Sequence, residues 1–116
     1  MKIVVCIKQV PAANDAKIDP ETKRIIREGQ KAVLNPFDTY ALEEGVRLKS
    51  LLGGEVIALT MGPPKAEAVL REAISVGADR AILLSDRGFG GSDTWATSYA
   101  LSKAIEKIGD VNLVIC

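Results

Sequence analysis

A glycine-rich loop at residues 85–94 (Ser-Asp-Arg-Gly-Phe-Gly-Gly-Ser-Asp-Thr) holds the residues whose types and spacing point most directly to chemistry. An apolar run at 81–84 precedes the loop, and a helical pattern over 95–108 follows it. The loop therefore joins a predicted strand end to a predicted helix start, which is where ligands bind in α/β proteins. Its glycines let the backbone approach a ligand closely, and the following helix amides favour anions such as phosphate. The pattern predicts a nucleotide or cofactor site.

Two more predicted strand ends, 8–11 and 60–64, should reach the same sheet edge. Each alone reads as an ordinary turn, but together they bring glycines, polar side chains and helix N-termini to one crevice. Several single residues keep two interpretations. Lys8 either steadies a phosphate or caps the sheet edge, and Asp93 caps a helix in a way that still lets Thr94 contact a ligand. Phe89 packs on a partner surface or on a flat ring, whereas Arg87 is equally explained as half of a surface ion pair.

Composition excludes several classes of function. With 116 residues the chain forms one domain at most, and its 15 basic and 15 acidic residues leave no net charge. This balance disfavours nucleic acid and anionic membranes as partners, and no apolar run is long enough for membrane insertion. The absence of histidine excludes histidine-based catalysis and histidine-ligated metals, so we expect neither catalytic nor metal-binding residues. Cys6 and Cys116 lie in apolar runs, which predicts reduced thiols and a cytoplasmic location.

The apolar pattern predicts an α/β fold, namely an open, mainly parallel sheet with helices on both faces, similar to a Rossmann fold. Continuous apolar runs indicate buried strands at 2–10, 55–60, 80–84 and 110–116, of which at least the first three should be parallel. Helical spacing predicts helices at 36–51, 65–76 and 95–108, the first capped by Asn35 before Pro36. An excursion near residues 16–28 should form a β-hairpin. We expect residues 1–116 to be the N-terminal part of a single nucleotide-binding domain that is cut after its fourth strand.

Familiar nucleotide motifs are missing. No Gly-x-Gly-x-x-Gly fingerprint follows the first strand, and no Gly-Lys-Ser/Thr loop is present, which disfavours ordinary dehydrogenases and P-loop NTPases. The nucleotide would instead be held by contacts from separate strand ends.

Several motifs resemble the β-subunit of electron-transfer flavoproteins over essentially the whole chain. They are Val-Cys-Ile-Lys-Gln-Val-Pro at 5–11, Lys-Ile-Asp-Pro at 17–20, Asn-Pro-Phe-Asp at 35–38, Tyr-Ala-Leu-Glu at 40–43, Thr-Met-Gly-Pro-Pro at 60–64, Val-Gly-Ala-Asp-Arg at 76–80 and the 85–94 loop. Ala12 departs from the family, which usually has an aspartate after the Val-Pro pair.

The resemblance implies an electron carrier that pairs with an FAD-containing α-subunit and is not a self-sufficient enzyme. The β-subunit of the family holds AMP in conventional members and a second FAD in electron-bifurcating members. The 85–94 loop is closer to the bifurcating type, so FAD is favoured over AMP, with NADH or a dehydrogenase as electron donor. The resemblance also implies an acyl-CoA-type or other dehydrogenase, ferredoxin or flavodoxin as the partner in electron exchange. The family's phosphate-gripping stretch follows the fourth strand, so the nucleotide affinity of these 116 residues alone should be poor.

The predicted cofactor-binding residues combine the motifs with the strand-end loops, and we expect Cys6, Asn35, Asp38, Met61 and Thr94 to lie near one another. The full set is Cys6, Lys8, Asn35, Pro36, Phe37, Asp38, Thr60, Met61, Gly62, Arg87, Phe89, Gly90, Gly91, Asp93 and Thr94.

Two alternatives remain open on the sequence. The chain could be a stand-alone regulatory module that binds an adenine nucleotide, or a structural subunit with a vestigial site. The predicted hairpin and Phe89 favour the electron-transfer subunit, because a subunit that docks partners has a use for both features.

Overall fold

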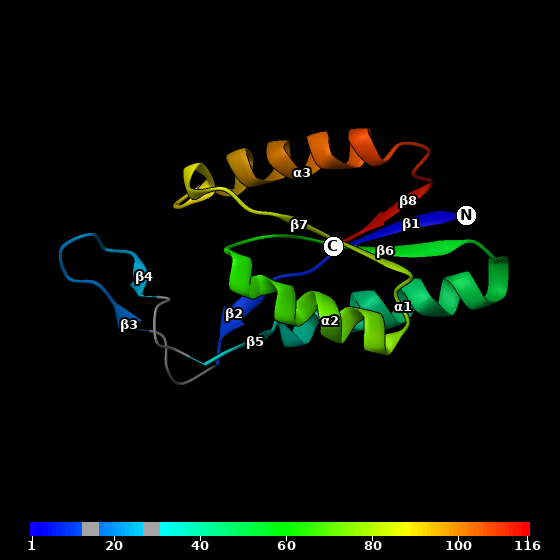
Figure 1. Cartoon of the computed structure of the whole chain (residues 1–116), viewed down its shortest axis with the longest axis horizontal. Helices are drawn as coiled ribbons and strands as arrows, with labels where there is room; N and C mark the ends of the chain where they lie inside the picture. The colour runs from blue at the N-terminus through cyan, green and yellow to red at the C-terminus, as the bar shows by residue number, and fades with distance from the viewer. Residues whose placement is uncertain (13–16, 27–30) are drawn as a thin grey trace.

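Four parallel strands form the central sheet of the structure, a computed structural model that describes residues 1–12, 17–26 and 31–116. The strands are β1 (Lys2–Cys6), β6 (Glu55–Met61), β7 (Arg80–Leu84) and β8 (Leu113–Ile115), in the order β7-β6-β1-β8 (Figure 1). Each neighbouring pair is parallel. The predicted parallel arrangement of the first three strands is therefore confirmed.

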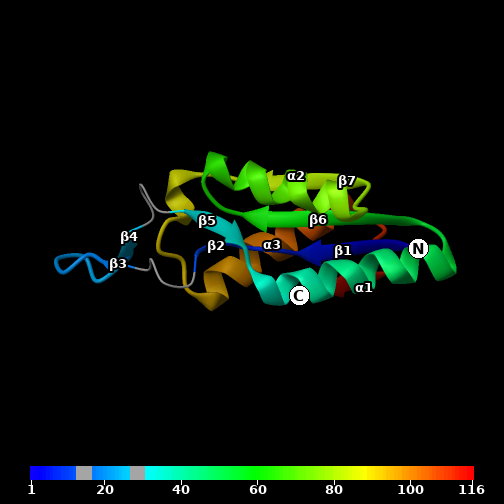
Figure 2. The same ribbon diagram turned by 90° about the horizontal axis from the view of Figure 1, so that it is seen from below.

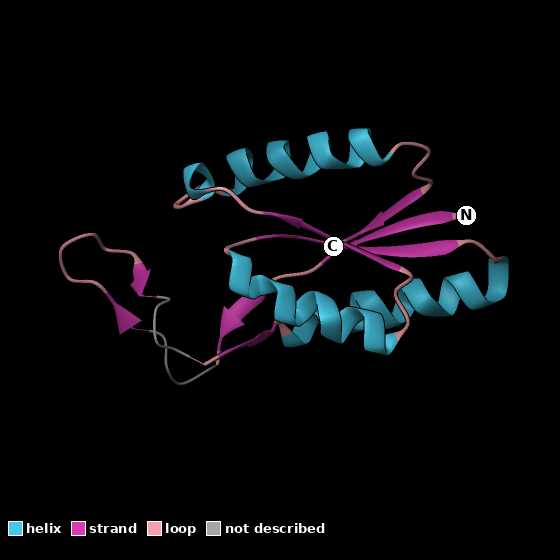
Figure 3. Ribbon diagram, viewed as in Figure 1, coloured by secondary structure: helices cyan, strands magenta, loops and turns pink. Residues whose placement is uncertain are grey.

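Helices cover both faces of this sheet, as the α/β prediction required. Helices α1 (Pro36–Leu52) and α2 (Glu67–Val76) lie on one face, and α3 (Thr94–Ile108) lies on the other (Figures 2 and 3). Val5 packs in the cluster that contains α1 and α2 side chains, whereas its neighbour Val4 packs in the cluster that contains α3 side chains. Alternate residues of a strand face opposite sides, so a strand buried on both faces must be apolar throughout.

The first predicted strand, 2–10, is wrong in its second half. β1 ends at Cys6, and β2 (Gln9–Pro11) pairs antiparallel with β5 (Ala32–Leu34) in a separate two-stranded sheet. The backbone of Lys8 marks the break, because its N–H donates to the Asp38 carboxylate and its carbonyl accepts from the Asn35 N–H at 2.8 Å. An apolar run does not reveal that its backbone groups change partners, so the sequence indicated one continuous strand.

Two other element boundaries differ from the prediction in small ways. The predicted 65–76 helix begins as the short 3-10 helix η1 (Pro64–Ala66) and continues as α2. The fourth strand is shorter than 110–116, because Asp110 has a left-handed φ of 54° and the chain is still turning there. Asn112 then donates its N–H to the Lys2 carbonyl at 2.9 Å and brings β8 into register with β1.

The predicted hairpin is present. β3 (Lys17–Ile18) pairs antiparallel with β4 (Ile25–Ile26), and the Asp19 carboxylate accepts the Glu21 N–H at 2.8 Å in the turn. The hairpin extends beyond the end of the main sheet (Figures 1 and 2). Its predicted ends at Ala16 and at 27–28 lie outside the described residues.

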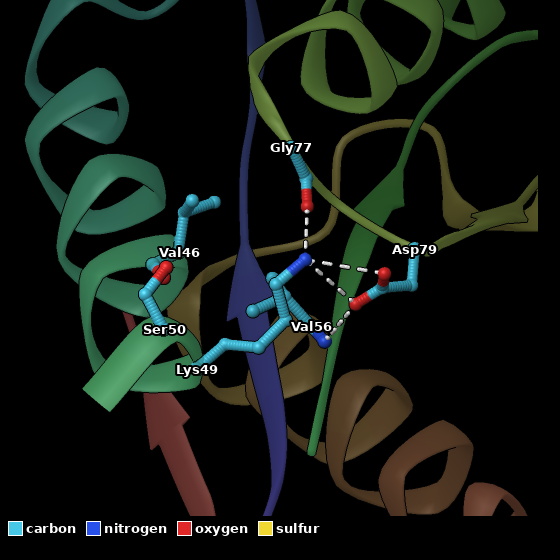
Figure 4. Close-up of polar contacts among 6 residues, drawn as sticks. All are labelled: Val46, Lys49, Ser50, Val56, Gly77 and Asp79. Carbon is cyan, nitrogen blue, oxygen red and sulfur yellow. Dashed lines mark hydrogen bonds and ion pairs between the residues drawn. The ribbon is translucent and has the colours of Figure 1, made fainter. Parts of the chain in front are cut away.

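Asp79, just before β7, fastens three elements together at the amino edge of the sheet (Figure 4). Its carboxylate accepts the Val56 N–H at 2.8 Å and lies 3.2 Å from the Lys49 Nζ, which also donates to the Gly77 carbonyl at 2.8 Å. Gly77 has a φ of +135°, and a Cβ there would lie 3.0 Å from a methyl group of Val46. The Val-Gly-Ala-Asp-Arg motif therefore joins α1, β6 and the turn before β7.

We expect Asp79→Ala to lower the free energy of unfolding by about 1 kcal/mol at pH 7, since the Val56 N–H loses its carboxylate partner and the half-exposed ion pair adds little. The Val56 hydrogen bond, followed by Lys49, lowers the pKa of Asp79 from 3.8. A lowered pKa means that the stabilisation is present above the unfolded-state pKa and is lost as the pH falls through the folded-state pKa. The difference between wild type and variant should therefore shrink in urea titrations at pH 3.

Glu106→Ala is the matched control, because the Glu106 carboxylate pairs with Lys103 of the same helix on an exposed face. Its effect should stay within a few tenths of a kcal/mol. If the two variants lower the free energy of unfolding equally at pH 7, Asp79 does not stabilise the contact between α1, β6 and the turn before β7.

Candidate functional site

Lys8 connects two strand ends at the carboxyl edge of the sheet. It lies two residues beyond β1, and its N–H donates to Asp38 Oδ2 at 2.7 Å. Its Nζ donates to the carbonyl of Met61, the last residue of β6. A Cβ built on Gly62 would lie 3.9 Å from the same Nζ. One lysine thus links the start of α1 to the end of β6, and its ammonium group lies beside a glycine backbone.

The start of α1 is built by Asn35 and Asp38. Asn35 is the N-cap, since its Oδ1 accepts the Phe37 N–H at 3.2 Å, and Pro36 occupies the first turn as predicted. The Asn35 Nδ2 also donates to Asp38 Oδ1 at 3.5 Å. Burial raises the pKa of Asp38, and the N–H of Lys8 opposes that shift in part. The Asp38 carboxylate is thus held in place by Lys8 and Asn35, while Phe37 is 80% exposed.

Cys6, the last residue of β1, is partly buried near Asp38. Burial, followed by the nearby charges of Cys116 and Asp38, raises the pKa of Cys6 to about 11. A thiol with such a pKa is almost entirely protonated near neutral pH and is a poor nucleophile. Cys6 therefore offers packing and a backbone position at this edge, not covalent chemistry at neutral pH.

An open cleft of about 940 Å³ lies next to Lys8. Its volume lies within the range of roughly 300–1,000 Å³ that small-molecule sites occupy. Three segments wall it: the turn after β6, the glycine-rich loop and the hairpin. The lining residues are Lys8, Asp19, Thr22, Arg24, Ile25, Ile26, Met61, Gly62, Pro63, Pro64, Lys65, Phe89, Gly90, Gly91, Ser92 and Thr97.

The hairpin wall is the part of this cleft that the sequence analysis missed. The Arg24 side chain lies against the glycine-rich loop, since a Cβ built on Gly91 would come 3.0 Å from the Arg24 guanidinium carbon. Arg24 and Gly91, which are 67 positions apart in the sequence, thus meet at the wall of the cleft. The one available signal in the sequence was Arg24 beside Ile25 and Ile26. This pattern does not reveal the direction in which the hairpin folds.

The glycine-rich loop is held by its own polar groups. The Asp86 carboxylate accepts the Gly88 N–H at 2.7 Å at the start of the 3-10 helix η2 (Arg87–Phe89), and Ser92 Oγ donates to the Phe89 carbonyl at 2.7 Å. Gly91 has a φ of +77°, a left-handed conformation that favours glycine. Asp93 is the N-cap of α3 and accepts the Ala96 N–H at 2.8 Å. The loop is therefore ordered by local bonds that leave its backbone facing the cleft.

The predicted site residues separate into groups in the structure. Six of them line the cleft, namely Lys8, Met61, Gly62, Phe89, Gly90 and Gly91. Four others, Asn35, Pro36, Phe37 and Asp38, begin α1, and the Asp38 carboxylate is joined to the cleft through Lys8. Arg87, Asp93 and Thr94 are exposed near the glycine-rich loop but outside the lining.

Thr60 is the predicted site residue farthest from solvent, with 1% of its surface exposed. Its Oγ1 is buried without a hydrogen-bond partner among the described residues. Of the five residues expected to lie together, Cys6, Asn35, Asp38 and Met61 are connected around Lys8. No interaction recorded among the described residues joins Thr94 to them.

Two kinds of feature are absent from the described residues. Across 1–12, 17–26 and 31–116, no helix combines the length and hydropathy required to cross a bilayer. The same residues contain no group of three or more histidine, cysteine, aspartate or glutamate side chains placed to hold a metal ion.

Comparison with known proteins agrees with the motifs. Residues 22–116 match the family model described as "Electron transfer flavoprotein domain". The chain is 53% identical over 116 residues to the electron transfer flavoprotein subunit beta of Thermoanaerobacterium thermosaccharolyticum, covering 100% of this chain and 44% of that protein. It is 54% identical over 116 residues to the caffeyl-CoA reductase-Etf complex subunit CarD of Acetobacterium woodii, covering 99% of this chain and 44% of CarD.

A third relative is protein FixA of Azotobacter vinelandii, which is 57% identical over 108 residues, covering 93% of this chain and 38% of FixA. The chain thus spans less than half the length of these relatives. Because the family model matches most of the chain and the identities exceed half, the chain belongs to the electron-transfer flavoprotein β-subunit family.

Proposed function

We propose that this chain binds an adenine nucleotide cofactor, FAD, at the cleft beside Lys8 and serves an electron-transfer flavoprotein in which electrons pass through the flavin of an α-subunit. Family membership supports the electron-transfer role. The identity of the nucleotide, the donor and the acceptors are proposals that rest on the geometry of the cleft and on the resemblance of the loop.

The observation that carries the proposal is the charge of the cleft. Among its described lining residues, three are basic (Lys8, Arg24 and Lys65) and one is acidic (Asp19), although the whole chain has no net charge. A local excess of positive charge in a concave site attracts anionic ligands such as the phosphates of a nucleotide. The three cations come from the segment after β1, the hairpin and the 3-10 helix η1 after β6, so the fold concentrates them.

Three features support FAD over AMP. The cleft of about 940 Å³ extends from Lys8 to the glycine-rich loop and the hairpin. Phe89 lines this far end and is partly buried, so a flat apolar surface is available for a ring system. The left-handed Gly91 brings loop backbone to the same wall. AMP remains the alternative, and it would leave the far end of the cleft unused.

The side chains of this subunit would bind and orient the cofactor without reacting. A flavin bound here would supply the redox chemistry, namely two-electron and one-electron transfer. Lys8 is oriented by Asp38 and places positive charge on the cleft wall. The thiol of Cys6 is protonated near neutral pH, which favours a carrier over a thiol enzyme.

The proposed partners follow from the same assignment. We propose an α-subunit that carries FAD, NADH or an acyl-CoA-type dehydrogenase as donor, and ferredoxin or flavodoxin as the low-potential acceptor of a bifurcating complex. The two free cysteines support a reducing, cytoplasmic location. A stand-alone adenine-nucleotide regulator is disfavoured, because relatives with more than half identity are flavoprotein subunits.

The test is a count of released nucleotides. The full-length protein is purified together with its α-subunit and denatured, and FAD and AMP are quantified by chromatography. The proposal expects two FAD and no AMP per heterodimer. One FAD with one AMP would replace the proposal by the AMP-type carrier, and one FAD without AMP would indicate a vestigial β-subunit site.

A matched pair of variants tests whether the second nucleotide binds in the cleft beside Lys8. Lys8→Met removes the charge from the cleft wall and keeps an apolar stem, so β-site affinity should fall about tenfold or more, the contribution of one charge-assisted hydrogen bond. Lys103→Met removes the same charge from the exposed face of α3, outside the cleft. It should leave both nucleotides bound.

A further inference from the structure

Arg24 places a cation where the hairpin meets the glycine-rich loop. A Cβ built on Gly91 would lie 3.0 Å from both the guanidinium carbon and the Nη2 atom of Arg24, and 3.4 Å from its Nε. The guanidinium therefore occupies space that any other residue at position 91 would need for its own side chain. Both residues line the cleft, at the wall where the ring of the cofactor is proposed to lie.

The Arg24 guanidinium has no acidic partner in the described part of the chain, since none of the ion pairs found there includes it. Asp19 is the one acidic side chain among the described lining residues, and it is engaged within its own turn. Its Oδ1 accepts the N–H of Glu21 at 2.8 Å and the N–H of Thr22 at 3.4 Å. The positive charge at this wall is therefore available to a ligand in the cleft.

The lining around Arg24 is apolar. Ile25 and Ile26 follow it in the hairpin, and Phe89 lines the same cleft from the glycine-rich loop. The two lysines of the lining belong instead to the segments after β1 and β6. A guanidinium is planar and weakly hydrated, so it stacks on flat rings and donates hydrogen bonds from its edge. The surroundings of Arg24 therefore favour a flat ring with acceptor atoms at its edge over a strongly hydrated phosphate.

We propose that Arg24 raises the reduction potential of the flavin in this cleft, by binding the reduced ring more tightly than the oxidised ring. This inference rests on the proposed function, because it requires FAD in the cleft. Reduction by a hydride, which the proposed donor NADH gives up to become NAD⁺, adds two electrons and one proton to a neutral ring and leaves one negative charge on it. The fixed charge of Arg24 attracts that new charge and takes no part in the electron transfer itself.

The expected effect is moderate, because Arg24 is exposed and solvent screens its charge. Loss of the charge should reduce the preference of the site for reduced over oxidised FAD about tenfold, which lowers the potential of a two-electron couple by about 30 mV. A contact with a cofactor phosphate would give a different result, because the phosphates keep their charge during reduction. The affinities for oxidised and reduced FAD would then fall equally, and the potential would not change.

The experiment measures flavin potentials in the full-length protein purified together with its α-subunit. The heterodimer is reduced stepwise with dithionite in the presence of reference dyes, and the flavin absorbance is followed. Arg24→Gln removes the charge and should lower the potential of one flavin by about 30 mV, the tenfold change converted as above. The α-subunit flavin is the internal reference and should keep its potential. Arg24→Lys keeps the charge and should retain most of the wild-type potential.

Lys23→Gln is the matched control, because Lys23 precedes Arg24 on the same exposed hairpin and is not among the described residues that line the cleft. It removes an equal charge and should leave both potentials unchanged. AMP is the probe for a phosphate contact, and its affinity is measured after the β-site nucleotide has been removed. Because AMP has a phosphate and no flavin ring, the wild type and Arg24→Gln should bind it equally well.

The outcomes separate this inference from the proposed function. If the wild type holds two flavins and both potentials are unchanged in Arg24→Gln, the role of Arg24 is overturned and the proposed function stands. If Arg24→Gln binds AMP more weakly, or loses FAD equally in its oxidised and reduced states, Arg24 contacts a phosphate and the inference is again overturned. If the wild type holds one FAD per heterodimer, both the inference and the proposed function are wrong.

Discussion

Replacing Gly45 with valine is expected to destabilise the protein by roughly 3 kcal/mol, the upper end of the usual cost of overpacking a core. Gly45 is buried in the middle of α1, where the helix crosses the sheet. A Cβ at this position would lie 2.9 Å from a methyl group of Val5, 3.7 Å from Val56 and 3.8 Å from Ile3. The Cβ alone is already too close to Val5, and valine adds two further methyl groups to the same space.

Alanine at the same position tests the physical reason more sharply. In an exposed helix, glycine is less favourable than alanine by roughly 0.5–1 kcal/mol, so Gly→Ala normally stabilises. We expect Gly45→Ala to destabilise instead, by about 1 kcal/mol, because the helix must move away from β1 to admit the methyl group. Thermal and urea unfolding measure both effects.

Glu43 supplies the control, because it is exposed on the same helix, two residues before Gly45. Glu43→Val reports the cost of a β-branched residue in α1 without a core contact, and it should stay below about 1 kcal/mol. A Gly45→Ala variant more stable than the wild type would show that α1 does not approach the sheet as closely as these distances require.

The sequence was sufficient for the elements whose signals are local. Continuous apolar runs located the four strands of the main sheet, and for β1 and β6 the lack of alternation correctly indicated burial on both faces, whereas β7 and β8 are only partly buried or exposed. The Asn35-Pro36 pair located the start of α1 to the residue. Each of these features depends on a few neighbouring residues and on backbone chemistry that holds in any fold.

The features that the sequence missed all depend on partners far along the chain. The split of the first strand at Lys8 is caused by Asn35 and Asp38, which take over the backbone bonds of Lys8 about thirty residues away. The hairpin was predicted as an element, but its place as a wall of the cleft depends on Arg24 meeting the glycine-rich loop. The pairing of β8 with β1, which sets Val5 opposite Ile115, is equally a matter of topology.

From the sequence, the three glycines of the glycine-rich loop (Gly88, Gly90 and Gly91) have the same expected role, but their backbone conformations differ in the structure. Gly91 alone among them has a positive φ, of +77°, whereas Gly90 adopts φ −60° and ψ 125°, which any residue tolerates. A Cβ at Gly91 would also meet the Arg24 guanidinium at 3.0 Å, whereas a Cβ at Gly90 would meet the Arg87 carbonyl at 3.2 Å. Substitution at Gly91 therefore affects both the loop and the hairpin wall.

Gly91→Val is expected to remove most of the FAD from the proposed β-subunit site while the flavin of the α-subunit stays bound. Valine at a positive φ costs about 1–3 kcal/mol of backbone strain, and its side chain displaces Arg24 from the loop. Both changes alter the far wall of the cleft, where the flavin ring is proposed to lie. The full-length heterodimer should release about one FAD in place of two when it is denatured.

Two milder variants make the result specific to that wall. Gly90→Ala should keep nearly all of the second FAD, because its backbone is unstrained and its new methyl group requires a shift of only a few tenths of an ångström. Thr94→Val removes one hydroxyl and should weaken the same FAD by the roughly 0.5–1.5 kcal/mol of a single hydrogen bond. If Gly91→Val retains both flavins, the loop does not hold the ring. If the wild type releases one FAD and one AMP, the bifurcating assignment fails and the AMP-type carrier stands, with its nucleotide confined to the end of the cleft near Lys8.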